Sequence, residues 1–225
     1  MGYGTAAAFR KRSIGIFSTL ALIGGLGAAQ ADPVQILALG DSLTQGYGLP
    51  QGDGLVPQLQ GWLDARGADA TILNAGVSGD TTAGGRARLG WSLTDTVGAV
   101  IVELGGNDLL RGLPPAAARD NLDAILAEAS ARGLPILLVG LTAPGNYGPA
   151  YKADFDAIWP DLAVKYNTLL LPDLLAPIAV FTPEERVAKG LMQGDNIHPS
   201  AAGVTLVVEA LGPKVQELIE ESQGD

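Results

Sequence analysis

Five short apolar runs, with helical patterns between them, constrain the fold more than any other feature of this sequence. Most of the runs are continuously apolar rather than alternating, which is typical of strands buried on both faces of a parallel sheet. Apolar residues at helical spacing, such as Leu55, Leu59 and Leu63, separate the first run from the second. The alternation predicts a doubly wound α/β fold. The five runs are residues 34–39, 70–73, 99–104, 136–141 and 168–171.

Two helical patterns in the second half of the chain contain a proline. Apolar residues over 155–166 predict a helix that Pro160 disturbs. A longer apolar stripe over 204–219 predicts a final helix with a kink at Pro213. Proline has no N–H to donate and disturbs a helix interior, so these are the expected sites of irregularity.

The first residues have the three parts of a secretory signal peptide. A basic cluster at 10–12 precedes an uncharged stretch at 14–29, and residues 29–31 read Ala-Gln-Ala, a small-x-small cleavage pattern. The alternative is a transmembrane anchor, but the stretch is shorter than the roughly 20 apolar residues that a span needs. The sequence therefore predicts a signal peptide at 1–31, one domain at 32–225, and a periplasmic or secreted location.

Composition excludes several classes of function. The signal segment holds three of the 14 basic residues and no acidic ones, so removing it leaves 11 basic against 24 acidic residues, a net charge of −13. Such a charge argues against nucleic acid as a partner and against unaided docking on anionic lipid. With no cysteine and one histidine, the chain cannot build the usual zinc sites. We expect no metal, no cofactor and no stable membrane insertion after removal of the signal peptide; the sequence leaves the oligomeric state open and is compatible with a monomer.

Glycine-rich polar segments follow the predicted strands. "GDSLTQGYGL" comes after the first strand, "NAGVSGDTT" after the second, "GGNDLLRG" after the third, and "GDNIHPS" some way after the fifth. Ligands of open α/β sheets bind outside the carboxyl ends of the strands. We therefore expect these four segments to meet at one site.

Three residues of these segments suit nucleophilic catalysis. Ser42 is a possible nucleophile, although a serine after a strand is often a helix cap. His198 is the only imidazole in the chain, and histidine is the side chain that exchanges protons near neutral pH. Asp195, three residues earlier, can hold one ring nitrogen while the other faces the serine, as the third member of a triad does.

Acyl transfer also needs hydrogen-bond donors for the oxyanion that forms at the attacked carbonyl. The backbone N–H groups of Ser42 and Gly79 and the side-chain amide of Asn107 are the candidates. Either Gly79 or Asn107 alone would be ordinary turn chemistry. Their occurrence in successive segments, together with the sole histidine, favours a shared site.

The segments, in this order, resemble those of the SGNH hydrolases, also called GDSL esterases. Within that family the longer stretches, including "LNAGVSGDTTAGGRARL" and "LMQGDNIHPSAAG", resemble the bacterial periplasmic arylesterases and the multifunctional acyl-CoA thioesterase I/lysophospholipase enzymes. The resemblance implies a three-layer α/β/α sandwich around a five-stranded parallel sheet of flavodoxin-like order 2-1-3-4-5. It implies Ser42 as nucleophile, His198 as base, Asp195 as its partner, and Gly79 and Asn107 as oxyanion donors. The chain has no G-x-S-x-G motif, which separates it from the α/β-hydrolases.

The implied activity is hydrolysis of carboxylic esters through an acyl-serine intermediate. The substrates implied are aryl esters and short to medium acyl esters, with thioesters and lysophospholipids as further candidates. We expect the substrate to be bordered by residues beside the four segments and by the "GNYG" stretch. The apolar ones among them would either line an acyl groove or pack against a neighbouring helix, and the sequence does not decide between these. The candidate substrate-binding residues are Asp41, Leu109, Leu110, Leu113, Asn146, Tyr147 and Ile197.

Two other functions remain open at this point. The same serine chemistry would serve a carbohydrate esterase that removes acetyl groups from glycans. A non-catalytic binding protein that kept the fold is the other alternative, and the complete set of candidate catalytic residues argues against it.

Overall fold

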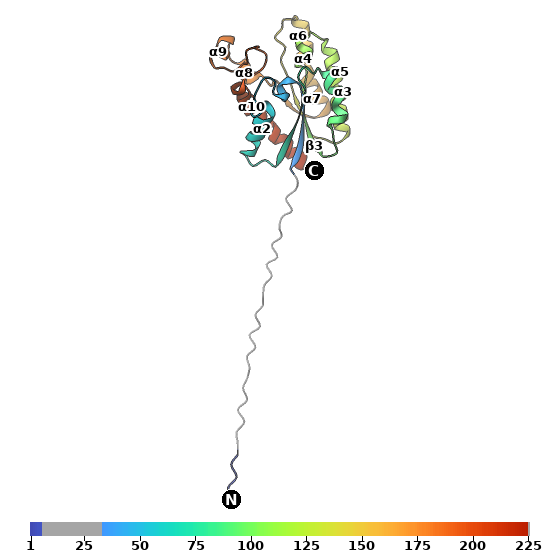
Figure 1. Cartoon of the computed structure of the whole chain (residues 1–225). Coiled ribbons are helices and arrows are strands. Elements are labelled where there is room, and N and C mark those ends of the chain that lie inside the picture. Colours follow the sequence, from blue (N-terminus) through green and yellow to red (C-terminus); the bar gives the residue numbers. More distant parts are fainter. Residues whose placement is uncertain (6–32, 225) are drawn as a thin grey trace. The chain divides into compact units, whose positions relative to one another are not determined.

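A five-stranded parallel sheet forms the centre of the part of the chain that the structure describes, which is residues 1–5 and 33–224 of a computed structural model (Figure 1). The strands lie in the order β2-β1-β3-β4-β5, which confirms the predicted order. Of the predicted signal peptide, residues 6–31 lie outside the described residues. The strands are β1 (Val34–Gly40), β2 (Ala70–Gly76), β3 (Val97–Glu103), β4 (Ile136–Val139) and β5 (Leu169–Leu171).

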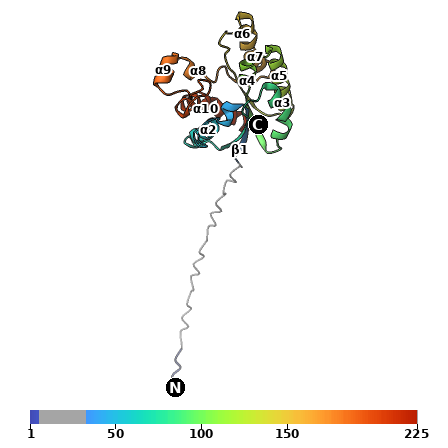
Figure 2. The same cartoon turned by 45° about the horizontal axis from the view of Figure 1, so that its top comes forward.

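Helices cover both faces of the sheet, which confirms the three-layer α/β/α sandwich. Figures 1 and 2 show α2 (Leu55–Asp64) and α10 (Ala201–Gln223) on one face, and α3 (Thr82–Ser92) and α5 (Pro115–Ala131) on the other. The helix α7 (Ile158–Tyr166) packs beside α5. The remaining helices, mostly short, are α1 (Ser42–Gln45), α4 (Gly106–Leu110), α6 (Pro149–Asp156), α7 (Ile158–Tyr166), α8 (Ala176–Ala179) and α9 (Pro183–Ala188).

The central strands are buried on both sides, as their continuous apolar runs predict. Every residue of β3 from Ala99 to Glu103 is buried, and so is every residue of β4. On one face α2 and α10 approach closely, because Gly212 of α10 lies under the ring of Trp62; a Cβ at Gly212 would come within 2.6 Å of that ring. No helix within residues 1–5 and 33–224 is long and apolar enough to cross a membrane.

Two details of the sequence-based expectations are wrong or still untested. The predicted helix over 155–166 is two helices, α6 and α7, which are separated at Ala157 rather than at Pro160. Pro160 lies in the first turn of α7, where the backbone N–H has no intrahelical partner in any case. The helix α10 runs through Pro213 as one element; the kink expected there stays a prediction.

Candidate active site

A continuous line of hydrogen bonds joins Ser42, His198 and Asp195 at the carboxyl edge of the sheet. His198 Nε2 lies 2.8 Å from Ser42 Oγ, and His198 Nδ1 lies 2.7 Å from Asp195 Oδ2. Ser42 begins α1, directly after β1, whereas the other two residues precede α10. The fold therefore brings together the hydroxyl, the imidazole and the carboxylate that the sequence singles out, across 156 residues of chain.

The loop that carries His198 is held by its own aspartate. Asp195 Oδ1 accepts hydrogen bonds from the backbone N–H groups of Ile197 and His198, at 2.9 and 3.0 Å, while its other oxygen accepts from the imidazole. Asn196 adopts the left-handed conformation, with φ 56°, which asparagine tolerates and which closes the turn. The hydrogen bond from the imidazole lowers the pKa of Asp195 to about 2, so this carboxylate stays ionised at neutral pH.

The turn that presents Ser42 is stabilised by buried carboxyl groups. Asp41 is the N-cap of α1, and its Oδ1 accepts from the N–H of Leu43 at 3.0 Å. Burial raises the pKa of Asp41 to about 6. Beneath it, the hydroxyl of Thr44 donates to Glu103 at the end of β3. Burial, and then the charge of Asp41, raise the pKa of Glu103 well above its usual value.

The segment after β2 runs beside the Ser42 turn. The N–H of Val77 donates to the carbonyl of Gly40 at 3.1 Å, and the hydroxyl of Ser78 donates to the side chain of Gln45. Gly79 follows with φ 85°, a conformation that residues with a Cβ rarely adopt. The two predicted backbone donors, of Ser42 and Gly79, make no hydrogen bond to other described residues, so both are available to a ligand.

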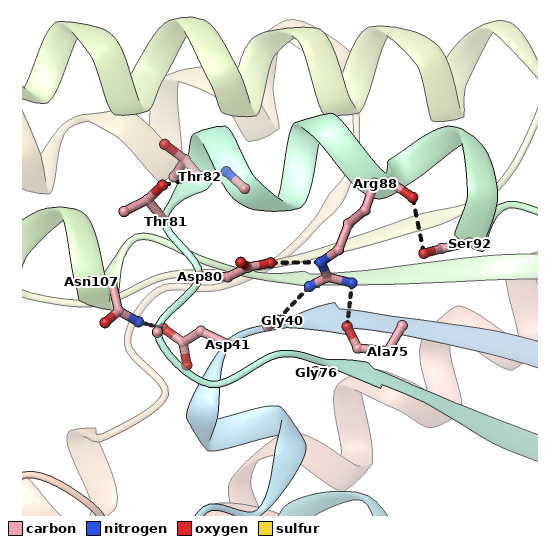
Figure 3. A network of polar contacts seen from close by, with 12 residues as sticks. Gly40, Asp41, Ala75, Gly76, Asp80, Thr81, Thr82, Arg88, Ser92 and Asn107 are labelled. Atoms are coloured by element: carbon pink, nitrogen blue, oxygen red, sulfur yellow. Dashed lines mark hydrogen bonds and ion pairs between the residues drawn. The ribbon is translucent and has the colours of Figure 1, made fainter.

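Asn107, the third predicted donor, is held by the residue that precedes the nucleophile. Its Nδ2 donates to Asp41 Oδ2 at 3.2 Å (Figure 3). An amide nitrogen carries two hydrogens, so this contact leaves one N–H for a ligand. Asn107 lies on α4, whose N-cap Gly105 has φ 120° and whose Gly106 leaves room for Asp41. The three predicted donors thus come from three neighbouring strand ends.

A buried carboxylate connects the two segments that carry Gly79 and Asn107. Asp108, which is 2% exposed, accepts hydrogen bonds from both the backbone N–H and the hydroxyl of Thr82, each at 2.7 Å. Thr82 begins α3, three residues after Gly79. The contact fixes the start of α3 against α4 and so limits the distance between the two donors.

A largely apolar cleft of about 490 Å³ opens beside Ser42 and His198. Leu109 and Leu110 of α4 lie on its wall, as do Asp41, Asn107 and Ile197. Besides Leu43, which follows Ser42, the other apolar wall residues come after β4 and β5, and the sequence did not single them out because they are not part of a polar motif. These are Leu141, Ala143, Pro144, Leu175, Ile178, Ala179 and Met192.

Three of the predicted substrate-binding residues do not belong to this lining. The hydroxyl of Tyr147 donates to the carbonyl of Leu110 at 3.3 Å, and its ring packs on Tyr151. The carbonyl of Leu113 accepts from the hydroxyl of Tyr151 at 3.0 Å. Asn146 is exposed beside them. Tyr147 thus contacts the end of α4, and none of the three residues is among those that line the cleft.

Two residues near the catalytic line escaped the sequence-based prediction. The ring of Tyr47 packs on the imidazole of His198, with 4.7 Å between ring centroids. The guanidinium of Arg88 reaches the end of β1 from α3. Both lie inside the quoted stretches, but nothing in the sequence indicates their orientation. Within residues 1–5 and 33–224 no cluster of histidine and carboxylate side chains is suited to a metal ion.

Comparison with known proteins identifies the family of this chain. Residues 38–206 match the GDSL-like lipase/acylhydrolase family. The chain is 37% identical to "Esterase TesA" of Pseudomonas aeruginosa, over 92% of this chain and 100% of that protein, and 35% identical to "Thioesterase 1/protease 1/lysophospholipase L1" of Escherichia coli K12, over 85% and 87%. The crystal structure of AlinE4, an SGNH-hydrolase family esterase, is 46% identical and superimposes with a TM-score of 0.67 over 84% of this chain and 98% of that one. The chain therefore belongs to the GDSL-like lipase/acylhydrolase family of SGNH hydrolases.

Proposed function

We propose that this protein hydrolyses carboxylic esters through an acyl intermediate on Ser42. The observation that carries the proposal is the unbroken line from Ser42 Oγ to His198 to Asp195, with distances of 2.8 and 2.7 Å, at the wall of an apolar cleft. Both distances lie within the reach that proton transfer between nucleophile, base and orienting group requires. The names of the relatives, esterase and thioesterase/lysophospholipase, support the same reaction class.

In the first half of the reaction, His198 Nε2 accepts the proton of Ser42 as Oγ attacks the ester carbonyl. Asp195 accepts the hydrogen bond from Nδ1, which keeps the Nε2 lone pair directed at the serine and stabilises the imidazolium. The N–H groups of Ser42, Gly79 and Asn107 are assigned to the developing oxyanion. The imidazolium then protonates the leaving alcohol or thiol, and the acyl group stays on Oγ.

In the second half, His198 takes a proton from water, and the resulting hydroxide attacks the acyl carbonyl. Collapse of the tetrahedral intermediate returns the proton to Ser42 Oγ and releases the acid. The same donors stabilise the oxyanion in both halves. Each group ends in its starting protonation state, so the cycle needs no metal and no cofactor.

The cleft favours acyl chains of short to medium length over glycans. Half of its lining residues are Leu, Ile, Ala or Met, which suit an acyl chain. Beyond Asp41 and the catalytic and oxyanion groups, only Thr142, Asp173, Arg186 and Asn196 of the lining offer polar side chains to the hydroxyl groups of a sugar ring. We therefore propose aryl esters and short to medium acyl esters as substrates, with thioesters and lysophospholipids as further ones. A deacetylase of glycans has less support from these walls.

The test is turnover of p-nitrophenyl esters from acetate to decanoate by the wild type and by the Ser42→Ala variant. We expect the wild type to be active and Ser42→Ala to lose on the order of 10³-fold or more in kcat. A fluorophosphonate should label the wild type at Ser42 and leave Ser42→Ala unlabelled. Near-full activity of Ser42→Ala would overturn the mechanism, and activity on acetylated glycans alone would overturn the substrate class.

We also propose that the protein is exported, because a basic cluster at 10–12 is followed by an uncharged stretch, as in a signal peptide. Cleavage after Ala31 would leave Asp32 as the first residue. N-terminal sequencing of the protein from a periplasmic extract tests this, and an intact N-terminus in the cytoplasm would contradict it. Outside the cytoplasm, esters and lysophospholipids are more accessible than acyl-CoA.

A further inference from the structure

One arginine outside the catalytic line holds three segments that meet at the site. Arg88 of α3 donates from Nε to Asp80 Oδ2 at 2.6 Å, from Nη1 to the carbonyl of Ala75 at 2.6 Å, and from Nη2 to the carbonyl of Gly40 at 2.7 Å (Figure 3). The side chains of Arg88 and Asp80 are about four-fifths buried, with exposed fractions of 21% and 19%. All three nitrogens of the guanidinium are therefore used inside the protein.

Two of the three acceptors, Gly40 and Asp80, lie next to a group that the proposed reaction needs. Gly40 ends β1, and its carbonyl belongs to the peptide unit that leads into Asp41 and Ser42. Asp80 directly follows Gly79. The same carbonyl of Gly40 also accepts from the N–H of Val77, two residues before Gly79. The planar guanidinium thus holds the Ser42 turn and the Gly79 turn in a fixed position relative to each other.

The local sequence is adapted to this contact. Gly84 leaves room for the Asp80 carboxylate, since a Cβ there would lie 2.6 Å from Asp80 Oδ1. The guanidinium is planar and offers donors in a fixed fork, whereas a lysine ammonium offers a single point of charge. An arginine at 88 can therefore satisfy three acceptors on three segments at once, and a lysine cannot keep the same geometry.

We propose that Arg88 is a positioning residue for the esterase reaction: it holds the backbone N–H groups of Ser42 and Gly79 at the separation that binds the oxyanion. This inference rests on the proposed function. Arg88 makes no hydrogen bond to Ser42, His198 or Asp195, so its removal takes no donor and no acceptor from the proton-transfer line. The loss should therefore fall on stabilisation of the transition state, which lowers kcat, and leave KM for a small ester nearly unchanged.

The experiment compares Arg88→Ala, Arg88→Lys and a matched control, Arg132→Ala, with p-nitrophenyl acetate as substrate. Arg132 also bonds a carbonyl and a carboxylate, those of Leu93 and Glu128, at 2.8 and 2.9 Å, and neither belongs to the site. We expect Arg88→Ala to lose about 10- to 100-fold in kcat, because a displaced donor costs less than an absent one. We expect Arg88→Lys to recover part of that loss and Arg132→Ala to keep wild-type kcat.

Chemical rescue separates positioning from general destabilisation. Millimolar guanidinium should raise the kcat of Arg88→Ala and leave that of Arg132→Ala and the wild type unchanged. Thermal melting of each variant ensures that activity is measured on folded protein, and Arg88→Lys carries the test if Arg88→Ala does not fold. An unchanged kcat in Arg88→Ala would overturn the proposal. If Arg88→Ala does not fold, an unchanged kcat in Arg88→Lys would do so. A loss of kcat in Arg88→Ala that guanidinium does not reduce would also overturn it. Because Ser42→Ala is measured in parallel, its retained activity would overturn the esterase mechanism itself, separately from any result at Arg88.

Discussion

The contact between Asp108 and Thr82 gives the sharpest test of how the site is held together. In Asp108→Ala the backbone N–H of Thr82, which is fully buried, loses its acceptor, and so does the hydroxyl. A buried donor left without a partner costs about 1–3 kcal/mol, and a second lost bond adds about 1 kcal/mol. We therefore expect the free energy of unfolding to fall by about 2–4 kcal/mol. For a chain of this length the melting temperature should fall by roughly 5–15 °C.

The assay is urea unfolding followed by tryptophan fluorescence, with kcat measured on each variant at low temperature. Thr82→Val keeps the backbone bond to Asp108 but removes the hydroxyl, which donates to Asp108 and accepts from Asn121 Nδ2, and should cost about 1–2 kcal/mol. The surface control Asp120→Ala, on α5, should change stability by less than about 0.5 kcal/mol. Because Asn107 adjoins Asp108, kcat should also fall in Asp108→Ala. A free energy of unfolding within about 0.5 kcal/mol of the wild type, with unchanged kcat, would refute the assignment of this carboxylate as the contact that holds α3 against α4.

Three further outcomes follow from single positions. Gly105→Ala should lower the free energy of unfolding by about 2–4 kcal/mol, because the residue has φ 120° and a Cβ there would lie 2.9 Å from the ring of Trp159. Gly133 has φ 71° but open space around it, so Gly133→Ala should lower the free energy of unfolding by less. Equal losses in the two variants would contradict the packing argument. The pKa of Asp41 is about 6 against 3.8 for the unfolded chain, so its favourable contribution is present below pH 3.8 and is lost as the pH rises through 6. Relative to Asp41→Asn, the wild type should therefore lose about 2–3 kcal/mol of stability between pH 4 and 7 in urea titrations, and parallel pH profiles would rule this out. Leu110→Ala should lower kcat/KM for an octanoyl ester about 3- to 10-fold relative to the acetyl ester, since Leu110 is 55% exposed on the cleft wall; an unchanged ratio would remove it from acyl binding.

Hydrophobicity and spacing predicted the sheet but not all of its ends. The strand β2 continues to Gly76, beyond the apolar run that ends at Leu73, because its last residues pair with β1 up to Gly40. In β3 the prediction extended to Leu104, which is fully buried but follows the strand. An apolar residue is buried in a turn as readily as in a strand, so hydrophobicity alone does not show where a strand ends.

Motif spacing placed Ser42 and His198 on the same edge, because the carboxyl ends of parallel strands meet there. It did not separate Leu109 and Leu110, which line the cleft, from Leu113, which does not. Leu109 and Leu110 lie on the short helix α4 and Leu113 lies beyond its end, and the apolar pattern does not show where that helix stops. Arg88 escaped notice for the same reason, since three of its contacts are to backbone or side-chain oxygens 8 to 48 residues away.

The placement of Asp195 and His198 three residues apart has a consequence for how hydrolysis is inhibited. The Asp195 carboxylate and the His198 imidazole lie on one short loop that Asp195 itself holds together, so a rearrangement elsewhere in the fold moves both groups as a unit. Only one coordinate, the gap between the loop and the serine, is left to vary. An inhibitor, an engineered tether or a crystal form that moves residues 193–199 away from Ser42 would stop hydrolysis, while the hydrogen bond between Asp195 and His198 within the loop persisted.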